Sequence, residues 1–226
     1  MNFLPSADNR KANMVGTVLI NSLNLPSYYP SIQFIREAVR TSSADVVLNF
    51  YELMAGMTYF FHEIDVPMIS IGHQYLFMHR DFGLPRHKFP ASYAMDFFSR
   101  LTSVGSVKHL ALSFREMEDD DEHDIIVVPP LLREEVYALE TTDGDYLHGY
   151  MLNAGFAEDV LSWHKEHPEV PLRFFWDKRD ADKVTKVDDT LSFHMIDDRE
   201  FLSQMAGCHA YASTAGFESV CEAMWM

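Results

Sequence analysis

The end of the sequence combines a small-residue turn and a glutamate at a spacing that could bind a nucleotide. The turn Ser213-Thr214-Ala215-Gly216 precedes a segment with helical periodicity. The first backbone N–H groups of such a helix lack intrahelical partners and lie at the positive end of the helix dipole, which suits a phosphate. Glu222 follows Gly216 by six residues, where its carboxylate could accept two hydrogen bonds from a ribose diol. An ordinary turn with solvated glutamates explains the same residues.

The helix after this turn has an amphipathic pattern. Four apolar residues recur at the spacing of one helix face, and we expect them to be buried: Phe217, Val220, Cys221 and Met224. Glu218 and Glu222 then share the polar face, away from this stripe. The pattern therefore predicts that both glutamates are accessible to a ligand.

Polar side chains also follow two apolar runs in the first half of the chain. His73 and Gln74 follow residues 67–71, and Glu52 follows residues 46–50. Ligands of α/β proteins bind beyond the carboxyl ends of the strands, so His73 is a candidate general base toward an acceptor hydroxyl, with Gln74 beside it. Glu52 is a second catalytic candidate. A loop histidine bonded to the backbone, and a glutamate favoured by a helix dipole, explain these residues as well.

The second half of the chain offers further ligand candidates. Asn153 and Gly155 follow the apolar residues 146–152, where a phosphate or sugar could approach the backbone. Asn153 as a helix N-cap explains them nearly as well. Asp143-Gly144-Asp145 has a spacing used to bind divalent cations, but no apolar strand precedes it, and we interpret it as a turn. We expect no metal and no cofactor.

The segments that must position these residues alternate between strand and helix patterns. Strands are expected at residues 46–50, 67–71, 107–113, 124–128, 146–152, 172–176, 191–195 and 209–212. Helices are expected from residue 30 onward and at 52–62, 91–101, 156–165, 197–206 and the terminal segment. Near-continuous apolar strands alternating with helices indicate parallel sheets covered on both faces. We predict an α/β fold of two Rossmann-like lobes, residues 1–140 and 141–226.

Two further expectations concern burial. In the helix at residues 52–62, Leu53, Met57, Phe60 and Phe61 are expected to face inward. The acidic run 116–124 is expected to be a solvated loop.

Composition limits the classes of function. The chain has 226 residues, 47% of them hydrophobic, and a formal net charge of -16. This charge argues against a nucleic-acid partner and against a polybasic membrane-surface protein. Two cysteines are too few for a disulfide framework, and no apolar run is long enough to span a membrane. A soluble cytoplasmic protein is the expectation.

The terminal motif resembles the donor-binding signature of GT-B glycosyltransferases, and most closely the branch of the peptidoglycan N-acetylglucosaminyltransferase. In that family a glycine opens a helix onto the nucleotide diphosphate and a glutamate six residues later holds the ribose, which Gly216 and Glu222 match. The resemblance implies that Ser213, Thr214 and Phe217 also belong to the donor site.

Three other stretches agree with this family in order along the chain. Residues 44–52 are similar to its D-V-V strand, and residues 66–74 resemble its P-V-V strand with the His and Gln displaced. Residues 193–198 resemble the segment whose backbone meets the nucleobase, which adds Ile196 to the donor site.

One departure from the family concerns the ends of the chain. Nothing like the family's G-x-G-G-H loop precedes Asn49, and the G-x-P turn expected after the terminal helix is missing. We therefore expect a chain truncated at both ends and inactive alone, with a first lobe that lacks its leading strand and glycine-rich loop. Exposed edges of such a fold would favour self-association.

The resemblance implies a glycosyltransferase that moves a sugar from a nucleotide-diphosphate donor, with UDP the expected nucleotide, to a glycan, lipid or small-molecule acceptor. The first lobe would bind the acceptor and the second the donor, with inversion and without a metal. In the full-length protein, peripheral association with the inner face of the membrane is compatible with this role. The alternatives are a nucleotide-sugar epimerase and a non-catalytic sugar-nucleotide-binding subunit that needs a partner chain.

Overall fold

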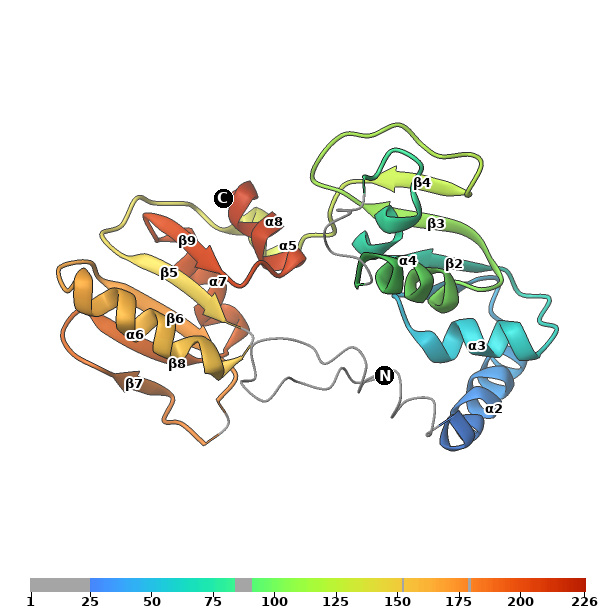
Figure 1. Cartoon of the computed structure of the whole chain (residues 1–226), viewed down its shortest axis with the longest axis horizontal. Helices are drawn as coiled ribbons and strands as arrows, with labels where there is room; N and C mark the ends of the chain where they lie inside the picture. Colours follow the sequence, from blue (N-terminus) through green and yellow to red (C-terminus); the bar gives the residue numbers. More distant parts are fainter. Residues whose placement is uncertain (1–24, 84–90, 152, 179) are drawn as a thin grey trace. The chain divides into compact units, whose positions relative to one another are not determined.

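The computed structural model describes residues 25–83, 91–151, 153–178 and 180–226, which divide into two compact units after Pro130 (Figure 1). From the sequence we placed the boundary after residue 140. The earlier division has a packing reason, because Val136 is only 1% exposed and packs with Phe175 and Phe201 in the core of the second unit. We expected the first lobe to lack its leading strand and glycine-rich loop. The start of the chain, residues 1–24, lies outside the described residues, so this expectation stays a prediction.

The first unit contains a four-stranded sheet in which all neighbouring strands are parallel, in the order β1-β2-β3-β4. Its strands are β1 (Val47–Asn49), β2 (Met68–Ile71), β3 (Ser106–Leu112) and β4 (Ile125–Val128). Its helices are α2 (Leu25–Thr41), α3 (Leu53–Phe61), α4 (Ala91–Thr102) and the 3-10 helix η1 (His73–Met78). The predicted alternation of strands and helices is confirmed here.

The close packing of α3 on the end of α4 decides which face of α3 is buried. A β-carbon at Gly56 would lie 2.5 Å from the carbonyl oxygen of Thr102, so only glycine permits this approach. The inward face consequently includes Gly56 and Thr58, which is 0% exposed. The prediction that Phe60 and Phe61 face inward is wrong, because these side chains are 65% and 57% exposed.

The acidic run between β3 and β4 contains one buried carboxylate. Asp120 is 0% exposed, and its Oδ2 accepts hydrogen bonds from the backbone N–H of Arg80 at 2.9 Å and from the His123 ring at 2.8 Å. The prediction of a fully solvated loop is therefore wrong at this residue. Asp120 instead joins the loop to the segment that follows η1.

The second unit contains a five-stranded sheet in the order β7-β8-β6-β5-β9. Its strands are β5 (Leu147–Met151), β6 (Leu172–Trp176), β7 (Val184–Lys186), β8 (Leu191–Met195) and β9 (Ala210–Ser213). Its helices are α5 (Glu134–Ala138), η3 (Ala154–Phe156), α6 (Ala157–Glu166), α7 (Asp198–Ala206) and α8 (Phe217–Trp225). With the first unit, this arrangement confirms the predicted α/β class with Rossmann-like parallel sheets.

One strand departs from the parallel pattern. β7 pairs antiparallel with β8 through a tight hairpin that the sequence reading did not anticipate. The hairpin closes on Asp188, whose Oδ1 accepts hydrogen bonds from the backbone N–H groups of Thr190 at 2.9 Å and Leu191 at 2.8 Å. Such side-chain bonds to the backbone stabilise a local turn, and they allow an antiparallel edge strand here.

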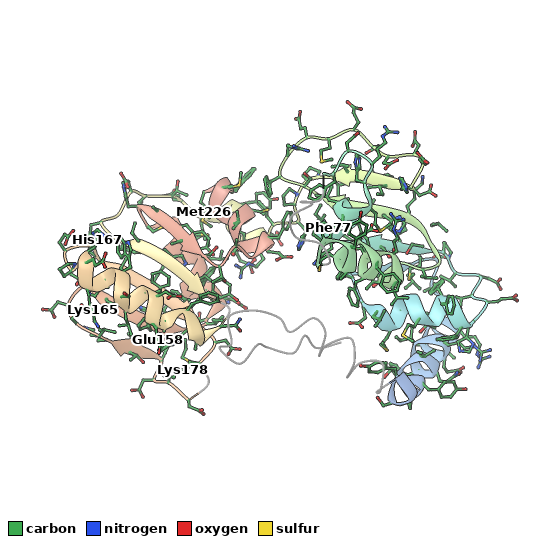
Figure 2. The ribbon with its side chains drawn as sticks, in the orientation of Figure 1. Phe77, Glu158, Lys165, His167, Lys178 and Met226 are labelled. Carbon is green, nitrogen blue, oxygen red and sulfur yellow. The ribbon has the colours of Figure 1, made fainter. Side chains whose placement is uncertain are left out.

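Both faces of this second sheet are covered, as predicted. Leu172 and Trp176 belong to a core cluster on the side of α6, whereas Phe175 packs with Phe201 and Met205 of α7 on the opposite side. The alternation along β6 follows from the two-residue period of a strand. Figure 2 shows α6 with Glu158 in its first turn and Lys165 in its last, an order that complements the helix dipole.

Candidate functional site

A pocket of about 610 Å³ lies at the carboxyl ends of β5, β8 and β9 in the second unit. Residues that line it are Leu131, Arg133, Tyr150, Ile196, Asp198, Phe201, Thr214, Ala215, Gly216, Glu218, Ser219 and Glu222. This edge of a parallel sheet is where α/β folds bind ligands, since the strand-to-helix loops converge there. The pocket is therefore the candidate site of this unit.

The turn between β9 and α8 forms one wall of the pocket. Ser213 Oγ accepts a hydrogen bond from the Ala215 N–H at 3.1 Å, and the Thr214 N–H donates to the Tyr150 carbonyl at 3.2 Å. These bonds hold Ala215 at a φ of 62°, an uncommon conformation for a residue with a side chain. The turn thus has a fixed shape before any ligand binds.

The start of α8 is open to the pocket. Gly216 is its N-cap residue, and within the described chain no side chain caps this helix. Gly216 and Ser219 both line the pocket, so the first turn of α8 directs its positive dipole end into the site.

Gly216 is not required by the fold around it. Its φ is −64°, and a β-carbon there would meet only the Ser219 Oγ, at 3.5 Å, an ordinary contact. A side chain at this position would instead occupy space in the pocket. Any need for glycine here arises from what the pocket binds.

An ion pair between Arg133 and Glu222 forms another part of the wall. Arg133 Nε donates to Glu222 Oε1 at 2.6 Å, and Arg133 Nη2 donates to Glu222 Oε2 at 2.8 Å. Arg133 Nη1 lies 3.7 Å from Asp198 Oδ1. The hydrogen bonds to Glu222 raise the pKa of Arg133 above its usual value. The guanidinium therefore remains a permanent cation beside the pocket.

The burial of α8 differs from the expected pattern. Glu222 is 3% exposed and Met224 is 64% exposed, whereas Cys221 is buried as predicted. The polar face on which we placed Glu222 is not solvated at this residue, because the bidentate bond with Arg133 stabilises its carboxylate against α5. Glu218 and Glu222 still share one side of the helix, since both line the pocket.

The other donor-site candidates divide into two groups. Ile196 follows β8, is 42% exposed and lines the pocket with Thr214, Gly216 and Glu222. Ser213 and Phe217 flank the turn, and neither is among the lining residues. Asn153 and Gly155 lie at η3, beyond β5 and also apart from the lining. Asn153 is the N-cap residue of η3, but its side chain does not cap it.

In the first unit, Glu52 and His73 follow neighbouring parallel strands and so lie toward the same edge of that sheet. Glu52 is the N-cap of α3: its Oε1 accepts from the Met54 N–H at 3.2 Å, and its own N–H donates to Asn49 Oδ1 at 2.7 Å. His73 is half-buried at the start of η1, with Gln74 next to it. Glu52 thus has the structural role that the sequence left open.

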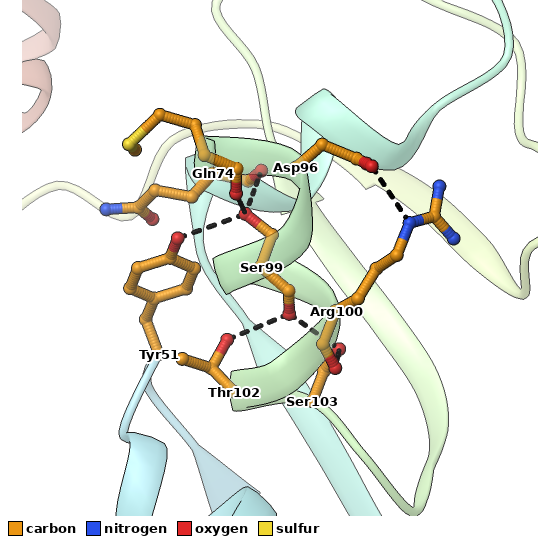
Figure 3. Close-up of polar contacts among 8 residues, drawn as sticks. Tyr51, Gln74, Asp96, Ser99, Arg100, Thr102 and Ser103 are labelled. Carbon is orange, nitrogen blue, oxygen red and sulfur yellow. Dashed lines mark hydrogen bonds and ion pairs between the residues drawn. The ribbon is translucent and has the colours of Figure 1, made fainter. Parts of the chain in front are cut away.

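A hydroxyl network fixes the start of η1 against α4 (Figure 3). The Tyr51 hydroxyl and Ser99 Oγ are 3.0 Å apart, and Ser99 Oγ donates to the backbone carbonyl of Gln74 at 3.2 Å. Tyr51 has a φ of 60°, and burial raises the pKa of its phenol. Ser99 thus bonds the backbone beside His73, and the Tyr51 hydroxyl contacts that backbone only through Ser99.

The described residues contain no cluster of three or more His, Cys, Asp or Glu side chains arranged to hold a metal ion. Asp143 contacts His209 at 2.7 Å, and both side chains are exposed. None of the helices in the described part of the chain is long and apolar enough to cross a bilayer.

Several pocket residues were not identified from the sequence, above all Arg133, Tyr150 and Phe201. Arg133 was assigned to the first lobe, and its partner Glu222 is 89 positions away. The one sequence feature that could have indicated Arg133 is its position between Pro129-Pro130, a break between elements, and the short helix α5. Sequence spacing alone does not pair residues at such a distance.

The fold is that of an α/β protein, with a candidate ligand pocket at the carboxyl edge of its second sheet. A family model described as glycosyl transferase family 1 matches residues 4–226. The chain belongs to this family, and the GT-B resemblance is confirmed at the level of a glycosyltransferase. Comparison with curated proteins and with solved structures gives no match.

Proposed function

We propose that this glycosyltransferase moves a sugar from a nucleotide-diphosphate donor to an acceptor hydroxyl, with the donor bound in the pocket of the second unit. The observation that carries the proposal is that the uncapped start of α8 and the Glu222 carboxylate line one pocket. An anion site and a hydrogen-bond acceptor for a diol are the two features that a nucleoside diphosphate requires.

The diphosphate would bind at the start of α8, where N–H groups and the helix dipole favour negative charge. Gly216 supports this assignment, because the protein itself leaves room for a β-carbon there. As the glycosidic bond breaks, charge develops on the leaving diphosphate, and the same N–H groups would stabilise it. This stabilisation does not depend on a metal, so the proposal is of metal-independent transfer.

The ribose would bind to Glu222. Arg133 occupies one hydrogen-bonding direction on each carboxylate oxygen. A carboxylate offers about four such directions, so a diol can still donate to Glu222. The nucleobase would then lie toward Ile196, which follows β8 and lines the same pocket.

The acceptor would be bound by the first unit, with His73 as general base and Gln74 beside it. His73 would take the proton of the acceptor hydroxyl as its oxygen bonds to the anomeric carbon. The bond from that carbon to the diphosphate oxygen breaks in the same displacement, and the nucleoside diphosphate leaves. A single displacement inverts the anomeric configuration. Glu52 is the weaker catalytic candidate, because its side chain already caps α3.

We further assign the protein to the cytoplasm and to the peptidoglycan N-acetylglucosaminyltransferase-like branch. Cys208 and Cys221 are both free, which is typical of a reducing compartment. The branch assignment rests on the spacing of Gly216 and Glu222 and on the resemblance of residues 44–52, 66–74 and 193–198, and it implies UDP as the nucleotide.

Calorimetric titration of this chain with UDP, GDP and ADP tests the donor assignment. We expect saturable binding of a nucleoside diphosphate, tightest for UDP, and weaker binding by at least tenfold in Glu222→Gln. Glu135→Gln removes a charge from an exposed residue of α5 outside the pocket and serves as the matched control. Failure of all three nucleotides to bind would contradict a donor site in this pocket.

A further inference from the structure

The Arg133–Glu222 pair is the most enclosed charged contact of the pocket. The Glu222 side chain is 4% exposed and the Arg133 side chain 37% exposed, and two hydrogen bonds of 2.6 Å and 2.8 Å join them. Both hydrogen bonds run in the parallel geometry that a guanidinium and a carboxylate form best. Such a contact fixes the orientation of the carboxylate as well as its position.

The backbone of Arg133 is itself held in place. Arg133 is the N-cap residue of α5, and its carbonyl accepts from the Val136 N–H at 3.0 Å. Val136 is 1% exposed in the core. A second contact also joins α5 to α8, since the rings of Tyr137 and Trp225 lie 5.1 Å apart. The guanidinium thus extends from a rigid support toward Glu222.

The surroundings of Glu222 explain why it needs such a partner. Glu218 lies one turn earlier on the same side of α8, and the Asp198 carboxylate also lines the pocket. Carboxylates this close repel one another, and a buried carboxylate without a partner is strongly disfavoured. Without Arg133, a rotamer that turns the Glu222 carboxylate away from the pocket would be lower in free energy.

We propose that Arg133 is a positioning residue that holds the Glu222 carboxylate in the orientation that recognises the ribose diol, so that the two residues select ribonucleotides as one unit. This inference rests on the proposed function and adds to it the residue that sets sugar specificity. Arg133 acts through Glu222, and it is not a phosphate ligand in this assignment.

The contacts of the guanidinium favour this role over direct phosphate binding. Nε and Nη2 donate to Glu222, and Nη1 lies 3.7 Å from Asp198. All three nitrogens therefore face carboxylates, which already balance the positive charge. A phosphate would have to displace one of these contacts.

The test compares binding of UDP with that of 2′-deoxy-UDP, which lacks one of the two ribose hydroxyls. The parent is expected to prefer UDP by about tenfold or more, the factor that corresponds to 1.4 kcal/mol. Arg133→Met and Glu222→Gln should each reduce this preference to about twofold or less, and the double variant should bind like either single one. Arg133→Lys keeps the charge without the paired geometry and should have an intermediate preference. Arg199→Met removes an exposed arginine of α7 outside the pocket and should keep the parent preference.

The outcomes separate this inference from the proposed function. In one outcome, Glu222→Gln loses the preference for UDP over 2′-deoxy-UDP, whereas Arg133→Met retains it and is folded as judged by circular dichroism. That outcome overturns the inference about Arg133 and leaves the proposed function intact. Equal weakening of both ligands by Arg133→Met, with uridine unaffected, would make Arg133 a phosphate ligand and also overturn it. If the parent shows no preference, or binds neither nucleotide, the ribose assignment itself fails and the inference with it.

Discussion

The imidazole of His148 lies edge-on against the phenyl ring of Phe201, with the ring centroids 4.8 Å apart. His148 is 0% exposed, and neither of its ring nitrogens has a hydrogen-bond partner among the described residues. Burial, followed by the repulsion of His194 and Arg173, lowers the pKa of His148 to about 4. The core beneath the pocket therefore contains a histidine that is neutral in the folded protein.

The first prediction is that the second unit loses stability as the pH falls from about 6.5 to about 4. In this window the unfolded chain takes up a proton on His148 and the folded protein does not, so acid favours unfolding. The contribution of this residue is on the order of 3 kcal/mol, since one pKa unit corresponds to about 1.4 kcal/mol. All three tryptophans, Trp163, Trp176 and Trp225, belong to the second unit, so urea unfolding followed by their fluorescence reports this unit alone.

His148→Leu should reduce this pH dependence, whatever its effect on stability at pH 7. His194 is also buried, and burial lowers its pKa, so a smaller slope should remain in the variant. An unchanged slope in His148→Leu would show that His148 is not the group responsible.

The second prediction concerns Gly216→Val. The fold has room for a side chain there, because a β-carbon meets only Ser219 Oγ at 3.5 Å. We expect the free energy of unfolding to fall by about 1 kcal/mol or less, because valine is a poorer N-cap residue than glycine. Binding of UDP should weaken at least tenfold, because the side chain would fill the diphosphate position. Tight binding by a folded Gly216→Val would place the diphosphate elsewhere.

The third prediction separates the two roles of Glu52. If the residue only caps α3, Glu52→Gln should keep both the stability of this chain and the turnover of the full-length enzyme, because an amide oxygen can still accept from the Met54 N–H. Glu52→Ala should then lose about 1 kcal/mol of stability, as is usual for a lost N-cap. A loss of turnover in Glu52→Gln at unchanged stability would instead make Glu52 a proton-transfer group.

The fourth prediction concerns His73 as general base. In the full-length enzyme, His73→Ala should lower turnover by tenfold or more at saturating donor and acceptor, the lower range of general-base contributions. UDP binding should be unchanged, since the proposed donor pocket belongs to the second unit. Turnover equal to that of the parent would remove His73 from the mechanism.

The fifth prediction tests the support of this edge of the first sheet. Asn49 is 2% exposed; its Nδ2 donates to the Thr102 carbonyl at 2.7 Å, and its Oδ1 accepts from the Glu52 N–H at 2.7 Å. Asn49→Leu should destabilise the first unit by about 2–4 kcal/mol, because the buried Thr102 carbonyl and the Glu52 N–H at the start of α3 both lose their partner. Circular dichroism during thermal unfolding measures the effect, with Arg40→Ala as the control. Arg40 makes an exposed ion pair, and its loss should change little.

The sequence by itself determined the class of fold and the order of its elements. Apolar runs and helical periods are local properties, and they located β6, β8 and α7 to within a residue or two. The turn at residues 213–216 and Glu222 were also recognisable, because the elements of the proposed donor motif are close together in the chain. Four of the residues selected in this way line the pocket together: Ile196, Thr214, Gly216 and Glu222.

Only the tertiary structure decided how these residues are paired and buried. Periodicity along α8 placed Glu222 on the polar face of the helix, whereas Arg133, 89 positions away, binds it in a nearly buried site. In the same way, the contact of Gly56 with the end of α4 turned Phe60 and Phe61 outward. Helical periodicity states which residues share a face, but which face is buried depends on the element that packs against it. A contact between distant segments leaves no local signal in a single sequence.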